Sequence, residues 1–433
     1  MTVYNLLSDV LAGVLALLSL LLLLAPTGRG AGIRAILQRG FERATGRAVR
    51  WLSWWHITAL VAVVVGVVMG FDVTTGLYGC PAPGGPSDIV GFLNQGRALW
   101  TGRDPFNVSD CGTTILEPDG LAAVLINGLG SVAGAAGIAF VWGAIAVALI
   151  PLTWLVAGPD RRYLTLVVAA SPIYLPLVAT QIDGASNALV PAIVLLTLFL
   201  ATRSEVRGTI VAGLLATQRF PTLFPVLAMS GSFRRRFASA VALLVAFAVG
   251  TGIAYLAWGS EFIGPVFLDQ LGRRSFSLNL WGVFLLNHLV PSGNGLAIGQ
   301  AVVTLILVAV VFWRVRSPLR AAAITLTGVA LLTQFLSFNI LVWLLPVALV
   351  GARPRWWLWG IAVVGSVNYD YALNVATGAQ GLLWPSEVLD VLLTVLLLGL
   401  FIDLWRSADG TGPRATDPLP SPPPRANRDL SGG

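Results

Sequence analysis

The stretch AAGIAFVWGAIAVALIPLTWLVA at residues 135–157 contains no charged side chain, and it decides the class of the fold. About 20 consecutive apolar residues are enough for a helix to cross the hydrocarbon core of a bilayer. The run therefore predicts a transmembrane helix. Arg161 and Arg162 follow it directly, as is typical of a helix that ends on the cytoplasmic side.

The composition of the whole chain agrees with this interpretation. Of its 433 residues, 56% are hydrophobic and 11% are charged, and the mean hydropathy is +0.82. Soluble domains carry about 25% charged residues. The sequence therefore predicts an all-α polytopic membrane protein. All 27 basic residues are arginine, which suggests a GC-rich genome such as that of an actinobacterium.

The arginines lie in short loops between the apolar runs, and they predict the orientation of the helices. Such loops stay in the cytoplasm, so the net charge of +7 sets topology and we expect no nucleic-acid partner. The dense basic loop at 29–50 is expected inside, so the helix at 52–71 runs outward and 72–117 forms an outer loop. Further spans are expected near 135–157, 163–180, 184–201, 236–258, 296–314, 357–373 and 384–405.

Two segments do not fit as single crossings. Residues 208–230 leave one basic loop and return to another, and TQRFP interrupts them; residues 320–350 do the same around SFN. Each predicts a hairpin of two helical legs, because broken backbone at membrane depth must be buried in protein or line a wet cavity. The expected fold is a helical bundle of about nine spans with two broken hairpins and a cavity on the outer face.

The chain is expected to have three parts. Residues 1–51 hold an N-terminal helix, retained rather than cleaved, and the basic loop. Residues 52–405 form the membrane domain. Residues 406–433 are rich in proline, serine, aspartate and arginine and predict a disordered cytoplasmic tail. The expected location is the plasma membrane, with several crossings and a cytoplasmic C-terminus.

Polar residues from separate segments come together on the outer face in this topology, where they are expected to surround one cavity. They are Asp72, Asp88, Arg103, Asp104, Gln181, Asp183, Asn187, Gln218, Arg219, Arg273, Arg274, Asn279 and Asn339. Arg219 is the sharpest candidate, because an arginine between apolar legs is costly in a bilayer. The alternative is a structural arginine that extends to the interface or pairs with Asp183.

Two features of the outer loop have both a structural and a functional interpretation. Cys80 and Cys111 are the two cysteines of the chain, and an oxidising exterior permits a disulfide between them. Such a bridge would close a loop of about 30 residues and stabilise it by about 3–4 kcal/mol; two unpaired thiols are the alternative. Asp88 follows Ser87 at the start of a patterned helix, so a helix cap is its simplest role.

The start of that helix resembles glycosyltransferases of the GT-C class that use polyprenyl-phosphate sugars, notably glycosyltransferase family 87. In that family an outer-loop Asp precedes an aromatic residue by four positions, and a run like G-A-R-A-L-L-x-G-x-x-P-Y follows. Asp88, Phe92, GRALWTG at 96–102 and Pro105-Phe106 fall at those spacings. Three later stretches are also similar to family motifs: TQIDGASNAL at 180–189, AGLLATQRFPTLFPVL at 212–227 and SLNLWG at 277–282.

The resemblance implies a GT-C-like catalytic domain over 52–405 and a candidate for each chemical role. The family's outer-loop Asp is a proposed base, which Asp88 would be here, with Asp72 as the competing candidate. Guanidinium groups suit the departing lipid phosphate, and the candidates are Arg103, Arg219, Arg273 and Arg274. No cofactor or metal is expected. The aromatic positions are Phe where the family has Tyr, and SFNILVW at 337–343 lacks the family's histidines, so no histidine role is carried over.

The expected activity is transfer of mannose or arabinofuranose, with inversion, from a polyprenyl-phosphate donor to a glycolipid or polysaccharide of the cell envelope. The partners are therefore the lipid-linked sugar, the glycan acceptor and membrane lipid. Two alternatives stay open. Polar broken hairpins also occur in transporters, which favours a transporter or a flippase for lipid-linked sugars. The missing histidines favour an inactive scaffold.

Overall fold

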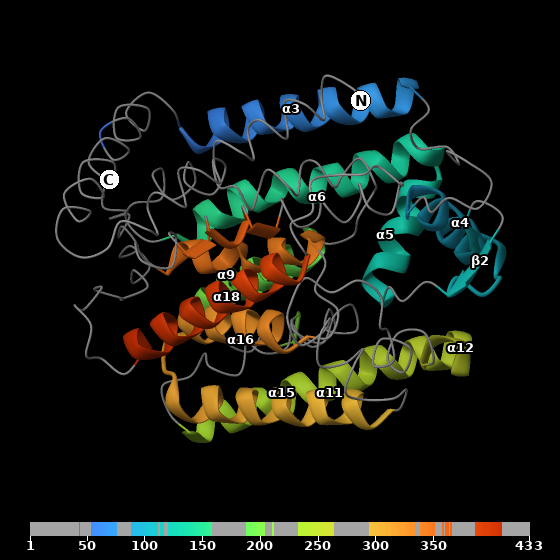
Figure 1. The fold of residues 1–433 in the computed structure, drawn as a ribbon. Coiled ribbons are helices and arrows are strands. Elements are labelled where there is room, and N and C mark those ends of the chain that lie inside the picture. Colours follow the sequence, from blue (N-terminus) through green and yellow to red (C-terminus); the bar gives the residue numbers. More distant parts are fainter. Residues whose placement is uncertain are drawn as a thin grey trace, which may run out of the picture.

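A computed structural model gives the fold of the chain (Figure 1). It describes residue 43 and residues 53–75, 88–110, 113–116, 120–157, 188–203, 210–211, 233–263, 294–333, 338–350, 357–358, 360–362, 364–365 and 386–408. The α-helices are α3 (Trp54–Thr75), α4 (Asp88–Thr101), α5 (Leu121–Ser131), α6 (Gly134–Val156), α9 (Leu189–Arg203), α11 (Phe233–Trp258), α12 (Ser260–Ile263), α15 (Asn294–Arg314), α16 (Pro318–Leu332) and α18 (Ser386–Ala408). A 3-10 helix, η6, covers Phe338–Leu349, and two strands, β1 (Asn107–Asp110) and β2 (Thr113–Leu116), complete the described elements.

Three of the described helices are long and apolar enough to cross a membrane. They cover Gly134–Val156, Phe237–Trp258 and Val388–Arg406, and each overlaps an expected span. Helices dominate such chains because a bilayer offers no water to pair with backbone N–H and C=O groups. The all-α membrane class is therefore confirmed, whereas the expected number of spans stays a prediction.

The segment expected as a hairpin at 320–350 contains two helical legs. Helix α16 forms the first leg and η6 the second, and the two pack against each other. Asn339, which the sequence places in the break, is the second residue of η6. The other expected hairpin, at 208–230, lies outside the described residues except for 210–211.

The core of the bundle lies where α6, α9, α16, η6 and α18 meet. Trp142, Leu149, Ile193 and Leu344 are among its fully buried side chains. Two buried hydroxyls in these helices donate to a carbonyl one turn earlier: Thr153 Oγ1 to the Leu149 carbonyl at 2.6 Å, and Thr325 Oγ1 to the Ala321 carbonyl at 2.7 Å. By contrast, α11 and α15 expose rows of leucine, valine and isoleucine on their outer sides. These rows are the sides that lipid would cover, because large apolar patches are unfavourable in water.

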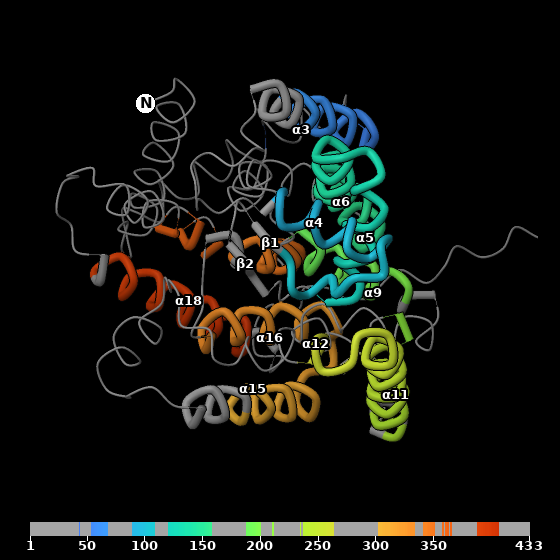
Figure 2. Tube along the Cα trace, turned by 90° about the vertical axis from the view of Figure 1, so that its right-hand side faces the viewer, coloured from blue at the N-terminus to red at the C-terminus, as the bar shows by residue number. Residues whose placement is uncertain are grey.

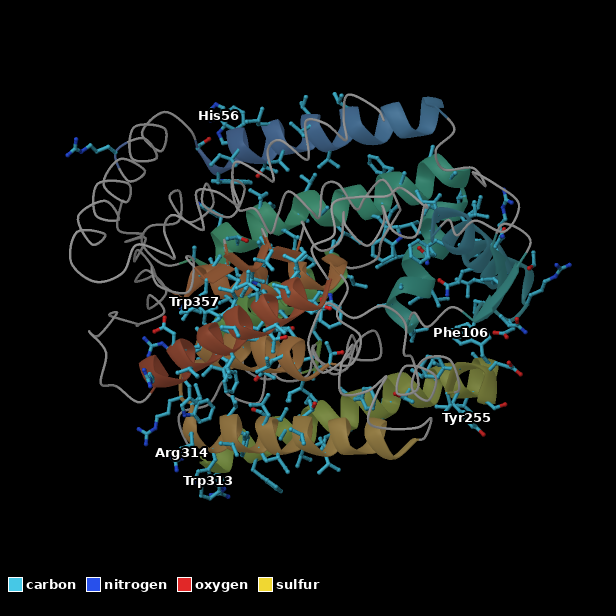
Figure 3. The ribbon with its side chains drawn as sticks, viewed as in Figure 1. His56, Phe106, Tyr255, Trp313, Arg314 and Trp357 are labelled. Carbon is cyan, nitrogen blue, oxygen red and sulfur yellow. The ribbon has the colours of Figure 1, made fainter. Side chains whose placement is uncertain are left out.

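The long helices have two distinct ends. At one end, marked by His56, Trp313 and Arg314 in Figure 3, α3 begins and α15 ends. Trp54 stacks on Trp154 there, with ring centroids 5.1 Å apart, so α3 and α6 run antiparallel. The opposite end carries α4, β2 and α12, and it faces the viewer in Figure 2.

The outer loop expected at 72–117 is more structured than the sequence suggests. Helix α3 continues to Thr75, and α4 occupies the middle of the segment. Strands β1 and β2 pair antiparallel, with Asn107 opposite Leu116 and Asp110 opposite Thr113. Within the all-α fold the outer segment thus also contains a short β-hairpin, in which Val, Thr and Ile favour an extended backbone.

Candidate functional site

The two candidate bases lie at the ends of helices α3 and α4. Asp88 is the first residue of α4, and Asp72 lies in the last turn of α3. The side chains of both lie outside the described residues. The structure therefore places the backbone of each aspartate at a helix end, and their chemical roles stay predictions.

Helix α4 is held against α5 at very short range. Gly96 faces the backbone of Asn127, and a Cβ at Gly96 would overlap the Asn127 carbonyl oxygen. On the opposite helix, a Cβ at Gly128 would come within 2.6 Å of the Leu99 side chain. The helices approach this closely because neither carries a side chain at the contact, which gives the first residue of GRAL, Gly96, a packing role.

A chain of three buried side chains joins α4, α5 and α6. Trp142 Nε1 donates to Asn127 Oδ1 at 2.9 Å, and Asn127 Nδ2 donates to Gln95 Oε1 at 2.6 Å. All three side chains are fully buried. We call Gln95, Asn127 and Trp142 the amide relay. A second bond, from Trp100 Nε1 to the Gly128 carbonyl at 2.7 Å, ties α4 to α5 one turn further on.

The end of α4 is defined by backbone hydrogen bonds. Gly102 has a φ of 67°, and its N–H donates to the Leu99 carbonyl while the Arg103 N–H donates to the Ala98 carbonyl. This is the Schellman arrangement that commonly ends helices at a glycine. The candidate phosphate ligand Arg103 thus lies directly after the helix, and it is exposed.

After Arg103 the chain turns, and Phe106 enters an aromatic cluster. Asp104 Oδ1 accepts a hydrogen bond from the Phe106 N–H at 2.9 Å, which closes a side-chain turn around Pro105. The Phe106 ring is fully buried and contacts Phe262 and Trp258 edge-on, at centroid distances of 5.3 and 5.6 Å. The cluster fastens the outer segment to the junction of α11 and α12.

The phenylalanines of the motif therefore have packing roles. Phe92 lies 5.8 Å from the Trp142 ring and is buried in the main core, and Phe106 is the centre of the second cluster. A hydroxyl on either ring would need a buried hydrogen-bond partner. The stretch from Phe92 to Phe106 thus sets the position and the end of α4.

The structure does not test the remaining candidates. The backbone of Asn339 is described in η6, whereas its side chain is not. The other expected cavity residues and the possible disulfide lie outside the described residues: Gln181, Asp183, Asn187, Gln218, Arg219, Arg273, Arg274, Asn279, Cys80 and Cys111. The cavity that they were expected to surround stays a prediction.

The amide relay was not predicted from the sequence. A signal was present, because Asn127 is a lone amide in the apolar run LAAVLINGLGS and a buried amide needs partners. The partners could not be identified, because Gln95 and Trp142 belong to other helices.

Two comparisons with known proteins found no match, one with curated proteins and one with solved structures. In the third, the family model described as Glycosyltransferase family 87 matches residues 118–338, just over half of the chain. The matched segment begins after the β-hairpin and includes Asn127, Trp142 and the three later stretches that resemble family motifs. It does not include α4. On this match, together with the apolar spanning helices, the chain belongs to glycosyltransferase family 87 and is a membrane glycosyltransferase.

Proposed function

We propose that the protein transfers a mannosyl or arabinofuranosyl group from a polyprenyl-phosphate donor to a cell-envelope glycolipid or polysaccharide, on the outer face of the plasma membrane. The observation that carries the proposal is the position of Asp88. It is the first residue of a helix that packing and hydrogen bonds fix to the family-matched segment. A carboxylate held rigidly beside a membrane-anchored donor is what proton removal from an acceptor requires.

The arginines of the described helix ends support this orientation. Helices α11 and α16 begin, and α15 and α18 end, at the end of the bundle marked by Arg314 (Figures 1 and 3). That end carries Arg234, Arg314, Arg316, Arg320 and Arg406. Because arginine-rich loops stay in the cytoplasm, the opposite end, with α4 and the β-hairpin, faces outward in this proposal.

The proposed reaction is a single displacement at the anomeric carbon. The Asp88 carboxylate takes the proton of the acceptor hydroxyl, and the hydroxyl oxygen forms a bond to the anomeric carbon from the face opposite the phosphate. The bond from that carbon to the phosphate oxygen breaks, and the phosphate keeps the electron pair. Arg103, with Arg219, Arg273 and Arg274, stabilises the charge that develops on the lipid phosphate. The configuration at the anomeric carbon is inverted.

Transfer from radiolabelled polyprenyl-phospho-mannose and polyprenyl-phospho-arabinofuranose tests the proposal directly. Purified wild-type protein should transfer one of them to an acceptor in a membrane extract, and Asp88→Asn should lower kcat by about 10²–10⁴-fold, which is the typical contribution of general base catalysis. Glu261→Gln is the matched control, since Glu261 is an exposed acid on α12 at the same end.

The outcomes separate the alternatives. Full activity in Asp88→Asn with loss of activity in Asp72→Asn would move the base to Asp72. Absence of transfer from either donor, together with movement of the lipid-linked sugar across vesicle membranes, would replace the transferase with a transporter. Absence of both activities would indicate a scaffold.

A further inference from the structure

The hydrogen bonds of the amide relay have a fixed direction. The indole Nε1 of Trp142 can only donate, so the atom of Asn127 that faces it must be Oδ1. Asn127 Nδ2 therefore faces Gln95, and the atom of Gln95 that accepts must be Oε1. A single tryptophan thus fixes the orientation of two amides on two other helices.

The relay reinforces a register that close packing also selects. A Cβ at position 96 would overlap the Asn127 carbonyl oxygen, so a shift of α4 by one residue would bring Gln95 or Arg97, each with a side chain, into that contact. Hydrogen bonds between Gln95 and Asn127, and between Trp100 and the Gly128 carbonyl, hold the same register. A shift of α4 by one residue would break both.

The register of α4 decides where Asp88 lies. One residue of helix corresponds to a translation of 1.5 Å and a rotation of 100°. Positions 88 and 95 are separated by nearly two full turns, so they lie along the same side of α4. A displacement of about 1 Å at a reacting group can lower a rate by about 10²-fold. A shift too small to unfold the protein is therefore large enough to impair catalysis.

The relay also has an energetic cost. Among the described residues, Gln95 Nε2 has no hydrogen-bond partner although it is fully buried. A buried donor without a partner costs about 1–3 kcal/mol. An apolar contact would fill this position without that cost, so fold stability alone does not explain a glutamine there.

We propose that Gln95 and Asn127 are positioning residues of the transfer reaction, which hold α4 in the register that places Asp88 against the family-matched segment. The inference rests on the proposed function, because the consequence of the register is the position of the proposed base. Gln95 lies before residues 118–338, whereas Asn127 and Trp142 lie inside them. The relay therefore joins the helix that begins with Asp88 to the part of the chain that defines the family.

An exchange of the two amides tests this inference. Gln95→Asn shortens the side chain on α4, and Asn127→Gln lengthens the side chain on α5, so each single variant disturbs the hydrogen bond between them. The double variant Q95N/N127Q restores the combined length of the two side chains. We expect each single variant to lower kcat by about 10²-fold with KM changed less than threefold. The kcat of the double variant should be at least tenfold higher than that of either single variant.

Thr153→Val is the matched control for the loss of a buried hydrogen bond. Thr153 lies on α6, as Trp142 does, and it is buried with its hydroxyl bonded to the Leu149 carbonyl. This variant should lower the melting temperature about as much as the single amide variants and leave kcat unchanged. Wild-type kcat in the single variants, or a double variant no more active than they are, would overturn the inference.

Amide hydrogen exchange of α4 separates failure of this inference from failure of the proposed function. Exchange over residues 89–101 should be faster in each single variant and slower again in the double variant, whether or not any sugar is transferred. If wild-type protein transfers no sugar but the exchange follows this pattern, the proposed function fails, whereas the conclusion that the amide relay holds the register of α4 stands. If Asp88→Asn is fully active, or if exchange is unchanged in the single variants, the positioning role is wrong.

Discussion

Gly96 of α4 lies directly against the backbone carbonyl of Asn127 on α5, closely enough that a Cβ at Gly96 would overlap the carbonyl oxygen. The clash would involve backbone, which cannot rotate away as a side chain can. The contact is therefore the point at which the outer helix is most sensitive to an added methyl group, and it lies beside the amide relay.

Gly96→Ala should displace α4 from α5. We expect a loss of stability of about 1–3 kcal/mol, typical of overpacking, and a fall in kcat on the order of 10²-fold because Asp88 moves with the helix. Thermal unfolding in detergent and the sugar-transfer assay measure the two effects. Gly66→Ala is the control, because a Cβ at Gly66 on α3 meets nothing within 4 Å. Equal behaviour of the two variants would contradict the close contact.

The turn around Pro105 should depend on the side-chain oxygen of Asp104, which accepts the hydrogen bond, and not on its negative charge. Asp104→Asn keeps an acceptor for the Phe106 N–H, so stability and transfer should stay near wild type. Asp104→Ala removes the acceptor and should lower stability by about 0.5–1.5 kcal/mol. Differential scanning fluorimetry of the two variants tests this difference. A large loss of transfer in Asp104→Asn would instead give this carboxylate a role in the chemistry.

The site of Phe106 should not tolerate the hydroxyl of the tyrosine that the family motif has at this position. Phe106→Tyr places a hydroxyl among Phe262, Trp258 and Val124, and we expect it to cost about 1–3 kcal/mol for lack of a partner. Phe106→Ala should cost about 3–5 kcal/mol through loss of packing. Both are measured by thermal unfolding, with Phe140→Tyr as the control because Phe140 is 73% exposed on α6. A Phe106→Tyr protein as stable as wild type would show that the cluster can satisfy a hydroxyl.

Cysteine labelling should distinguish the two ends of the bundle. In a background where Cys80 and Cys111 are replaced by serine, Asn107→Cys on β1 should react with a membrane-impermeant maleimide in intact cells. Arg316→Cys, between α15 and α16, should react only after the membrane is permeabilised, because we place that loop in the cytoplasm. The reverse labelling pattern would invert the proposed orientation and move α4 to the inside.

A charge on the lipid side of α11 should impair insertion. Leu244→Arg places a guanidinium on an exposed position within the span Phe237–Trp258 and should cost about 2.5–3.5 kcal/mol near its centre. Phe237→Arg at the start of the same span should be tolerated, because the side chain can reach the interface. The amount of folded protein extracted from membranes compares the two. Equal yields would indicate that this side of α11 does not contact lipid.

The sequence by itself determined the helical membrane class and the family. Long apolar runs must form helices because a bilayer cannot pair with free backbone groups, and the runs at 135–157, 236–258 and 384–405 overlap described helices. The family motifs are local in the chain, so the resemblance was visible without coordinates, and the match at 118–338 confirms it. The short β-hairpin of the outer segment was not predicted, because four-residue strands give a weak signal.

Only the tertiary structure decided which residues hold α4 in place. In a membrane protein both the buried and the lipid-facing sides of a helix are apolar: on α6, Trp142 is buried while Phe140, two positions earlier, is exposed. Periodicity therefore does not tell which side of a helix meets another helix. Gln95, Asn127 and Trp142 meet because three helices pack at one place, and that packing is set by the shape of the contact around Gly96 rather than by any local pattern in the chain.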